Sequence, residues 1–202
     1  MLEVGAGPTN PTSAFLATLG TVHGLDVSDE ALDNVHLTES RVVTATSQFP
    51  YDDGSFDAAV SNYAVEHVSD PRKHLSEIRR VLKPGSPYLF RTPNLFHYVA
   101  MVSRFTPHQV HLWLANPLRA MGRAHHDPWP TVYAMNTPVA VRRLAADTGF
   151  DVETMKLVEK EPSYGLYARP LFLLLMAYER AVNATEFLAA LRANLFVVLR
   201  RS

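Results

Sequence analysis

Short apolar runs, bounded by turn residues, alternate with stretches of helical periodicity along the first 92 residues of the chain. The expected strands are Leu2–Val4, Val22–Asp26, Arg41–Thr46, Phe56–Ser61 and Tyr88–Thr92. This alternation predicts an α/β fold with a parallel sheet and helices on both faces. Ligands of such sheets bind beyond the carboxyl ends of the strands.

The strongest helix prediction begins at Asp70-Pro71, an N-cap followed by a proline in the first turn. Its apolar residues Leu75, Ile78 and Leu82 recur on one face, and Lys83-Pro84-Gly85 ends the helix. Further helices are expected from Ser13 to Leu19, from Ser28 through Leu32, and from Thr137 to Gly149.

The second half of the chain is less regular. Prolines interrupt the segment from about residue 94 to 135, which we expect to form a cover of loops and short helices. A sixth strand is expected at Phe150–Val158, and a strongly apolar helix starts at Pro170. Its eight consecutive apolar residues are too few to span a bilayer, so packing in the core or in a homodimer is favoured over membrane contact.

Gly5 and Gly7 stand where the first strand turns into the first helix. Lacking a Cβ atom, they permit positive φ and let a ligand approach the backbone, although an ordinary turn explains the pair as well. Asp26 strengthens the functional interpretation, because an acid about 20 residues on holds the ribose hydroxyls in nucleotide-binding sheets. Asn10 stands in the place of a third glycine, which counts against a nicotinamide-dependent oxidoreductase.

The composition excludes several classes of function. The 202 residues are 47% hydrophobic and 19% charged, which suits one globular domain with a substantial core. The formal net charge of −1 and the scattered arginines give no electrostatic reason to expect nucleic-acid binding. The absence of cysteine excludes disulfides, thiolate catalysis and cysteine-based zinc sites. No signal-peptide pattern is seen, so a cytoplasmic location is expected.

Five of the nine histidines fall between Asn94 and Trp129. Histidines gather where protons are transferred or metals are bound, but also by chance in loops. His108 and His111 can face one way on a helix, with Asp127 further along, yet no third ligand is fixed by this spacing. We therefore expect no metal site. A packed cover without catalytic residues remains as good an interpretation as a substrate pocket.

Several blocks of sequence follow one another in the order of a known family. They are Glu3-Val4-Gly5-Ala6-Gly7, Asp26, Phe49-Pro50-Tyr51 with Ser55-Phe56-Asp57, Asn62 to Glu66-His67-Val68, and Arg79-Arg80-Val81-Leu82-Lys83-Pro84-Gly85. In this order they resemble the class I methyltransferases that use S-adenosylmethionine, specifically the bacterial small-molecule methyltransferase domain family.

The resemblance implies a Rossmann-like, seven-stranded, mostly parallel sheet with helices on both faces. The last strand, expected at Ala193–Leu199, would run antiparallel between strands five and six. Residues 1–202 would form one domain, with a cover insertion at about 94–135 and a helical insertion at about 168–191. Family members usually carry helices before the first strand, whereas this sequence starts on it. These helices are therefore expected to be missing, and either the start is truncated or the cover of the site comes from elsewhere.

The resemblance also implies a site for the cofactor S-adenosyl-L-methionine. The expected cofactor-binding residues are Glu3, Gly5, Gly7, Asp26, Ser47, Gln48 and Asn62. The two glycines would give backbone access to the methionine end, while Glu3 supports their loop. Asp26 would accept the ribose hydroxyls, and Asn62 would lie near the reactive methyl group. The acid that often receives the adenine amine is absent, so Ser47 or Gln48 is expected there.

Methyl transfer mainly requires alignment and exclusion of water, with a base where the acceptor is a hydroxyl. His67 is the first candidate for this base and His97 and His108 come next, although His67 is equally well explained as a residue that packs at a helix start. The expected acceptor is a small molecule, with an oxygen nucleophile favoured. A cofactor-binding relative without catalysis stays open, and a nicotinamide-dependent oxidoreductase is the weaker third hypothesis.

Overall fold

The structure is a computed structural model, and it describes residues 1–44, 47–98, 101, 130–159 and 169–202. The chain divides into two compact units. The first comprises Met1–Thr92, Thr131–Lys156 and Phe196–Ser202, and the second comprises Pro93–Pro130 and Leu157–Leu195.

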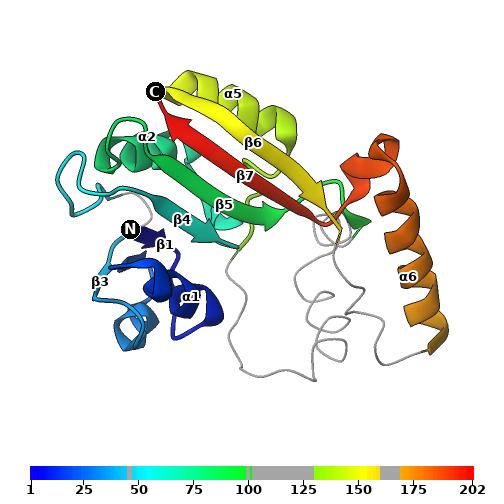
Figure 1. Cartoon of the computed structure of the whole chain (residues 1–202), viewed down its shortest axis with the longest axis horizontal. Helices are drawn as coiled ribbons and strands as arrows, with labels where there is room; N and C mark the ends of the chain where they lie inside the picture. Colours follow the sequence, from blue (N-terminus) through cyan, green and yellow to red (C-terminus); the bar gives the residue numbers. More distant parts are fainter. Residues whose placement is uncertain (45–46, 99–100, 102–129, 160–168) are drawn as a thin grey trace. The chain divides into compact units, whose positions relative to one another are not determined.

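A seven-stranded sheet organises the chain, with the strand order β3-β2-β1-β4-β5-β7-β6 (Figure 1). The strands are β1 Leu2–Val4, β2 His23–Asp26, β3 Glu39–Val42, β4 Ala59–Asn62, β5 Pro87–Pro93, β6 Phe150–Val158 and β7 Asn194–Arg201. The first five strands pair in parallel. Strand β7 is antiparallel to β5, because Gly85 donates to the Arg201 carbonyl at one end and Asn94 to the Ala193 carbonyl at the other. The sheet confirms the predicted fold class.

Helices and 3₁₀ turns connect these strands. They are α1 Pro11–Leu19, η1 Asp29–Asp33, η2 Val65–His67, α2 Pro71–Val81, α5 Pro138–Thr148, α6 Arg169–Ala184 and η4 Glu186–Leu191. Helix α2 begins as expected, since the Asp70 side chain accepts from the Lys73 backbone N–H. Its apolar face packs against α5, with Leu75, Ile78 and Val81 fully buried.

Several boundaries differ from the prediction, among them the following three. Strand β3 ends at Val42 rather than Thr46, and Ala45 and Thr46 lie outside the described residues. Strand β4 starts at Ala59 rather than Phe56, because the backbone of Phe56 bonds to Val81 and Lys83 at the end of α2 instead of extending the ladder. Helix α1 starts two residues before Ser13 because Asn10 caps it.

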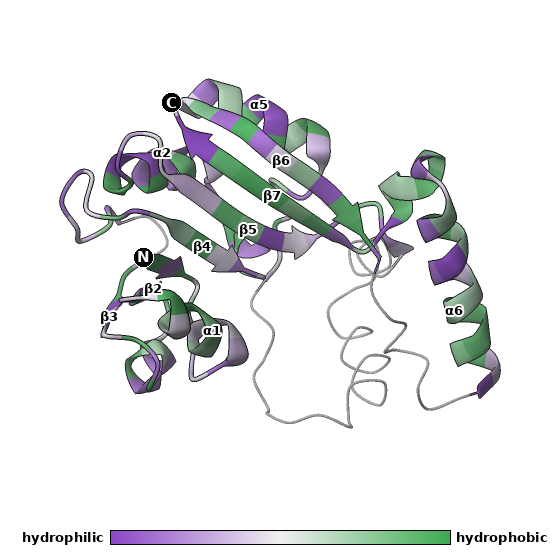
Figure 2. Ribbon diagram, viewed as in Figure 1, coloured by the Kyte–Doolittle hydropathy of each residue, from purple (hydrophilic) through white to green (hydrophobic). Residues whose placement is uncertain are grey.

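The core of the first unit lies along the central strands, where apolar residues predominate (Figure 2). Leu2, Leu25, Ala59 and Tyr88 are fully or almost fully buried. Burying apolar side chains contributes about 25 cal/mol for each square ångström removed from water. The short strand β1 is thus held by its neighbours on both sides, and its carboxyl end stays fixed.

The second unit is held by a buried arginine. Arg192 donates to the carbonyls of Val182 and Leu157 at 3.0 and 3.1 Å, and it pairs with the carboxylate of Glu186 at 2.9 Å. These bonds join α6 to η4 and to the end of β6. The expected insertion at about 168–191 contains α6 and η4, while most of the one at about 94–135 lies outside the described residues. The division into one domain with two insertions stays a prediction.

In the part of the chain that the structure describes, no helix has the length and apolar character that crossing a membrane requires.

Candidate functional site

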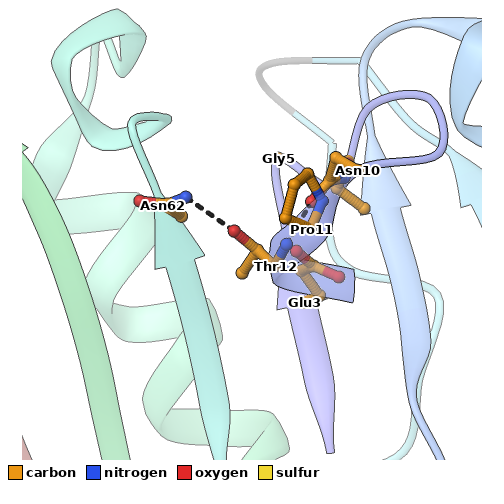
Figure 3. A pocket seen from close by; sticks show the side chains of 7 residues that line it. Glu3, Gly5, Asn10, Pro11, Thr12 and Asn62 are labelled. Atoms are coloured by element: carbon orange, nitrogen blue, oxygen red, sulfur yellow. Dashed lines mark hydrogen bonds between the residues drawn. The ribbon is translucent and has the colours of Figure 1, made fainter. Parts of the chain in front are cut away.

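A pocket of about 240 Å³ opens at the carboxyl ends of β1 and β4, against the first turn of α1 (Figure 3). It is lined by Glu3, Gly5, Ala6, Asn10, Pro11, Thr12 and Asn62. The carboxyl ends of neighbouring parallel strands are where such sheets bind ligands. Three of the expected cofactor residues, Glu3, Gly5 and Asn62, are therefore brought together here.

Gly5 and Gly7 both adopt positive φ, at 76° and 57°. At Gly5 an added Cβ atom would lie 2.2 Å from the Cβ of Ala64, so the loop after β1 touches the loop after β4 at this point. At Gly7 an added Cβ would meet nothing within 4 Å. The loop is thus packed tightly at Gly5 and open at Gly7. Open space beside a glycine lets a ligand lie against the backbone.

Asp26 fixes the far end of the same loop. One carboxylate oxygen accepts the Gly7 backbone N–H at 2.8 Å, and the other accepts the Ser28 N–H at 2.9 Å. A carboxylate offers about four acceptor positions, so each oxygen keeps capacity for one further donor. Asp26 is thereby oriented by backbone groups and can still accept two hydroxyls.

Glu3 is a buried acid whose side chain is 2% exposed. The hydroxyl of Ser13 accepts from both Asn10 and Asn34 at 2.9 Å, which leaves its own proton to donate to Glu3. The second oxygen, Oε2, is buried without a hydrogen-bond partner among the described residues. Burial raises the pKa of this carboxyl above its ordinary value of 4.5. A carboxylate in this position calls for a donor or a cation that the described residues do not supply.

Asn10, which the sequence interpretation treated only as a lost glycine, positions the whole loop. Its side-chain oxygen accepts from Thr12 and Ser13, and its amide nitrogen donates to the carbonyls of Ala6 and Pro8. The signal was present in the sequence, since an asparagine before a proline is a common helix start.

Asn62 reaches from the end of β4 to the start of α1. Its amide nitrogen donates to the Thr12 hydroxyl at 2.7 Å, which Figure 3 shows as a bond across the pocket. Its oxygen accepts from Nε of Arg91 at 2.8 Å. The Arg91 guanidinium lies over the ring of Tyr63, 4.2 Å from the ring centre. Thr12 and Arg91 were missed by the sequence interpretation, because their contacts to Asn62 join residues 50 and 29 positions apart.

The two residues expected at the adenine end lie in the turn before Phe49. The Ser47 hydroxyl donates to the Thr44 carbonyl at 2.8 Å and accepts from the Thr44 backbone N–H at 2.9 Å. Gln48 is exposed to solvent. Neither residue lines the pocket, so their role at the adenine stays a prediction.

The three candidate bases lie in different parts of the chain. His67 ends the η2 turn after β4, partly exposed, and its backbone N–H donates to the Ala64 carbonyl. His97 belongs to the second unit, where it is 6% exposed and 3.6 Å from the carboxylate of Glu159. Burial lowers the pKa of His97 to about 4, so it is a weak base near neutral pH. His108 lies outside the described residues.

A second buried acid, Glu66, follows β4 and is 5% exposed. Its carboxyl accepts the Thr92 hydroxyl at 3.1 Å, and that hydroxyl accepts from the amide of Asn136 at 2.6 Å. Its backbone carbonyl accepts from the N–H groups of Val132 and Tyr133. Glu66 therefore joins β4, the end of β5 and the segment that leads to α5.

The described residues contain no group of three or more histidine, aspartate or glutamate side chains arranged to hold a metal ion. The candidate ligands His108, His111 and Asp127 lie outside these residues.

Comparisons with known proteins agree with this geometry. Residues 2–90 match the family model described as a methyltransferase domain. The chain is 26% identical over 176 residues to a ubiquinone biosynthesis O-methyltransferase of Thiobacillus denitrificans, a match that covers 83% of this chain and 71% of that protein. Two other curated relatives are matched over only 30% and 44% of their length, so the chain spans less than half of these proteins.

Solved structures share the fold at low sequence identity. An S-adenosylmethionine-dependent methyltransferase from Mesorhizobium loti superposes with a TM-score of 0.61 at 16% identity, over 99% of this chain and 89% of that one. A [4+2]-cyclase, SpnF, superposes with a TM-score of 0.60 at 20% identity, over 99% of this chain and 73% of that one. The family match assigns residues 2–90 to a methyltransferase domain, and the sheet order, the pocket and the shared fold agree with that assignment.

Proposed function

We propose that the protein binds S-adenosylmethionine in the pocket at β1 and β4 and transfers its methyl group to an oxygen atom of a small molecule. The observation that carries this proposal is that Glu3 lines the pocket and that its buried Oε2 atom has no partner among the described residues. An ammonium group is the natural complement of a buried carboxylate, and the methionine end of the cofactor carries one.

The residues of the first unit fit the rest of the cofactor. Gly7, with open space where a Cβ would stand, would let the methionine end lie against the backbone. Asp26 has acceptor capacity left for the two ribose hydroxyls after its bonds to Gly7 and Ser28. Asn62 faces the pocket from β4 and would stand beside the transferred group.

The cofactor supplies a methyl group on a positively charged sulfur, which is a good leaving group. The chain's contribution is then to hold the acceptor in line and to exclude water. For a hydroxyl acceptor we propose His67 as the base that takes the proton. Two observations support this role. His67 lies on the turn after β4, five residues after Asn62, and its side chain is partly exposed. His97 ranks below it, because its lowered pKa makes it a weaker base.

The choice of an oxygen acceptor draws on the relatives, since the ubiquinone biosynthesis protein of Thiobacillus denitrificans is named an O-methyltransferase. Nothing in the described pocket selects oxygen over nitrogen or carbon. An extract screened for a methylated product, with the methyl group isotopically labelled, would identify the acceptor and the atom that carries the label. A label found only on nitrogen or carbon would overturn this part of the proposal.

Titration calorimetry tests the cofactor assignment. Binding of S-adenosylmethionine and S-adenosylhomocysteine is expected below millimolar concentration, with no binding of NAD under the same conditions. Asp26→Ala should lower the affinity for both sulfur ligands by about tenfold or more, because two charge-assisted hydrogen bonds are lost. NAD binding in place of the sulfur ligands would contradict the assignment. An unchanged affinity in Asp26→Ala would show that the ribose lies elsewhere.

A second candidate function is cofactor binding without methyl transfer. The observation that favours it is the fold shared with a protein named as a [4+2]-cyclase, which shows that this fold hosts other chemistry. The two functions separate in one assay, in which the bound cofactor is followed over time in the presence of cell extract. Conversion to S-adenosylhomocysteine with a labelled product supports the methyltransferase, and a cofactor that stays intact supports the alternative.

A further inference from the structure

Arg91 has no place in the expected site, yet it is bonded to a residue that lines the pocket. It stands near the end of β5, beside β4, and its Nε–H donates to the Asn62 side-chain oxygen at 2.8 Å. Its guanidinium lies between two aromatic rings, with the ring centre of Tyr63 at 4.2 Å and that of Phe196 at 5.6 Å. These contacts fix the direction of the Nε–H bond.

This contact decides which end of the Asn62 amide faces the pocket. A guanidinium has donors and no acceptor, so the atom it contacts must be the amide oxygen. The NH₂ group therefore points the other way, toward Thr12, and the Thr12 hydroxyl accepts from it at 2.7 Å. Because this hydroxyl accepts from Asn62, its own proton remains for another acceptor. Donation thus runs in one direction, from Arg91 through Asn62 to Thr12.

Without Arg91 the amide could turn over and present its oxygen to the pocket, since the two orientations have almost the same shape. With Arg91 in place, the pocket has donors on the side of Asn62 and Thr12 and an acceptor at Glu3. This polarity is the complement of an α-amino acid, which carries a carboxylate and an ammonium group on one carbon atom. Hydrogen bonds that follow one another in this way strengthen each other, and the positive charge of Arg91 adds to the effect.

We propose that Arg91 is a positioning residue that makes Asn62 and Thr12 the donors for the carboxylate of an amino-acid ligand. The inference rests on the proposed function, in which that ligand is the methionine end of S-adenosylmethionine. Arg91 acts through Asn62 and contacts no reacting atom. Its removal should therefore affect ligands that carry the amino-acid group and spare those that lack it.

The test compares two ligands in titration calorimetry. S-adenosylhomocysteine carries the amino-acid group, and 5′-methylthioadenosine has the same nucleoside and sulfur without it. Arg91→Met is expected to lower the affinity for S-adenosylhomocysteine by about tenfold, which corresponds to the loss of one oriented hydrogen bond. The affinity for methylthioadenosine should change by less than about twofold. The matched control is Arg41→Met, because Arg41 also lies over a tyrosine, Tyr51, at 4.6 Å but touches no pocket residue. It should leave both affinities unchanged.

Asn62→Asp provides a second variant that keeps the pairing with Arg91. Its carboxylate accepts from Arg91 but cannot donate to Thr12, so the same selective loss is expected even where Arg91→Met fails to fold. An equal loss for both ligands would show that Arg91 only supports the fold. Unchanged affinity for S-adenosylhomocysteine in Asn62→Asp would show that the amide orientation does not matter, and would overturn the inference. Failure of the unmodified protein to bind S-adenosylhomocysteine would instead overturn the proposed function.

Discussion

Two buried glutamates of the first unit, Glu3 on β1 and Glu66 on the η2 turn after β4, differ in how the protein satisfies their hydrogen bonds. Each is at most 5% exposed, and burial raises the pKa of each carboxyl. Glu66 accepts from its own backbone N–H and from Thr92, and its carbonyl receives two more N–H groups. Glu3 keeps one oxygen without a partner among the described residues, at the wall of the pocket.

We propose that this difference separates a structural acid, Glu66, from an acid that binds the cofactor, Glu3. A buried polar atom without a partner costs about 1 to 3 kcal/mol, so a folded protein retains one mainly where a ligand completes it. Glu66 bonds to three segments of the unit, so it needs no ligand to complete its hydrogen bonds. In the proposed function, the ammonium group of the ligand supplies the partner that Glu3 lacks among the described residues.

The largest effect is expected from Gly5→Ala, because Gly5 joins the two loops. The new Cβ would lie 2.2 Å from that of Ala64, which neither backbone can accommodate, and φ is positive at this position. We expect a loss of about 3 kcal/mol or more in the free energy of unfolding, measured by urea denaturation. Gly7→Ala is the control, and it should lose only about 1 kcal/mol, because the space there is open. Equal losses would mean that the contact with Ala64 is not needed.

Glu66→Ala should come next, with a loss of about 2 to 3 kcal/mol in unfolding free energy. The substitution removes the acceptor of the Thr92 hydroxyl and disturbs the bond that Asn136 makes to it. The affinity of the folded protein for S-adenosylhomocysteine should change by less than about threefold, since Glu66 does not line the pocket. A large loss of affinity with normal stability would place Glu66 among the binding residues.

Glu3→Gln should show the opposite pattern. Stability should change by less than about 1 kcal/mol, because the amide keeps the bond from Ser13 and removes a buried charge. The affinity for S-adenosylhomocysteine should fall by about tenfold to a hundredfold, because the ammonium loses its charged partner. Calorimetry beside urea denaturation measures both quantities. Normal affinity in this variant would remove the distinction between the two acids.

The smallest effect is a pH dependence of binding. Burial raises the pKa of Glu3 above 4.5, so above that pH the folded, ligand-free protein still holds a proton that the unfolded chain has released. Stability without ligand therefore falls as pH rises through this window. Affinity for the ammonium ligand rises over the same window, as Glu3 becomes ionised. Glu3→Gln should flatten the rise in affinity, and a rise of the same size in this variant would assign it to another group.

The sequence was enough to predict the sheet and to single out Glu3, Gly5 and Asn62, which the structure brings to one pocket. These residues could be singled out because strand ends and their spacing are local features. The roles of Arg91 and Glu66 were not found, because each depends on partners 26 or more positions away that only the folded sheet brings near. The predicted end of β4 was one residue short, and its predicted start was wrong by three residues, since Phe56 bonds to the end of α2. The residues expected at the adenine end stay a prediction, because no local sequence pattern identifies them.

A crystal structure of the protein with S-adenosylhomocysteine tests the central claim most directly. We expect the ligand's amino nitrogen at about 3 Å from Oε2 of Glu3, and its carboxylate at hydrogen-bond distance from Thr12 or Asn62. The two ribose hydroxyls should contact Asp26. A ligand bound with its amino group turned away from Glu3, and with Oε2 still lacking a partner, would contradict the account.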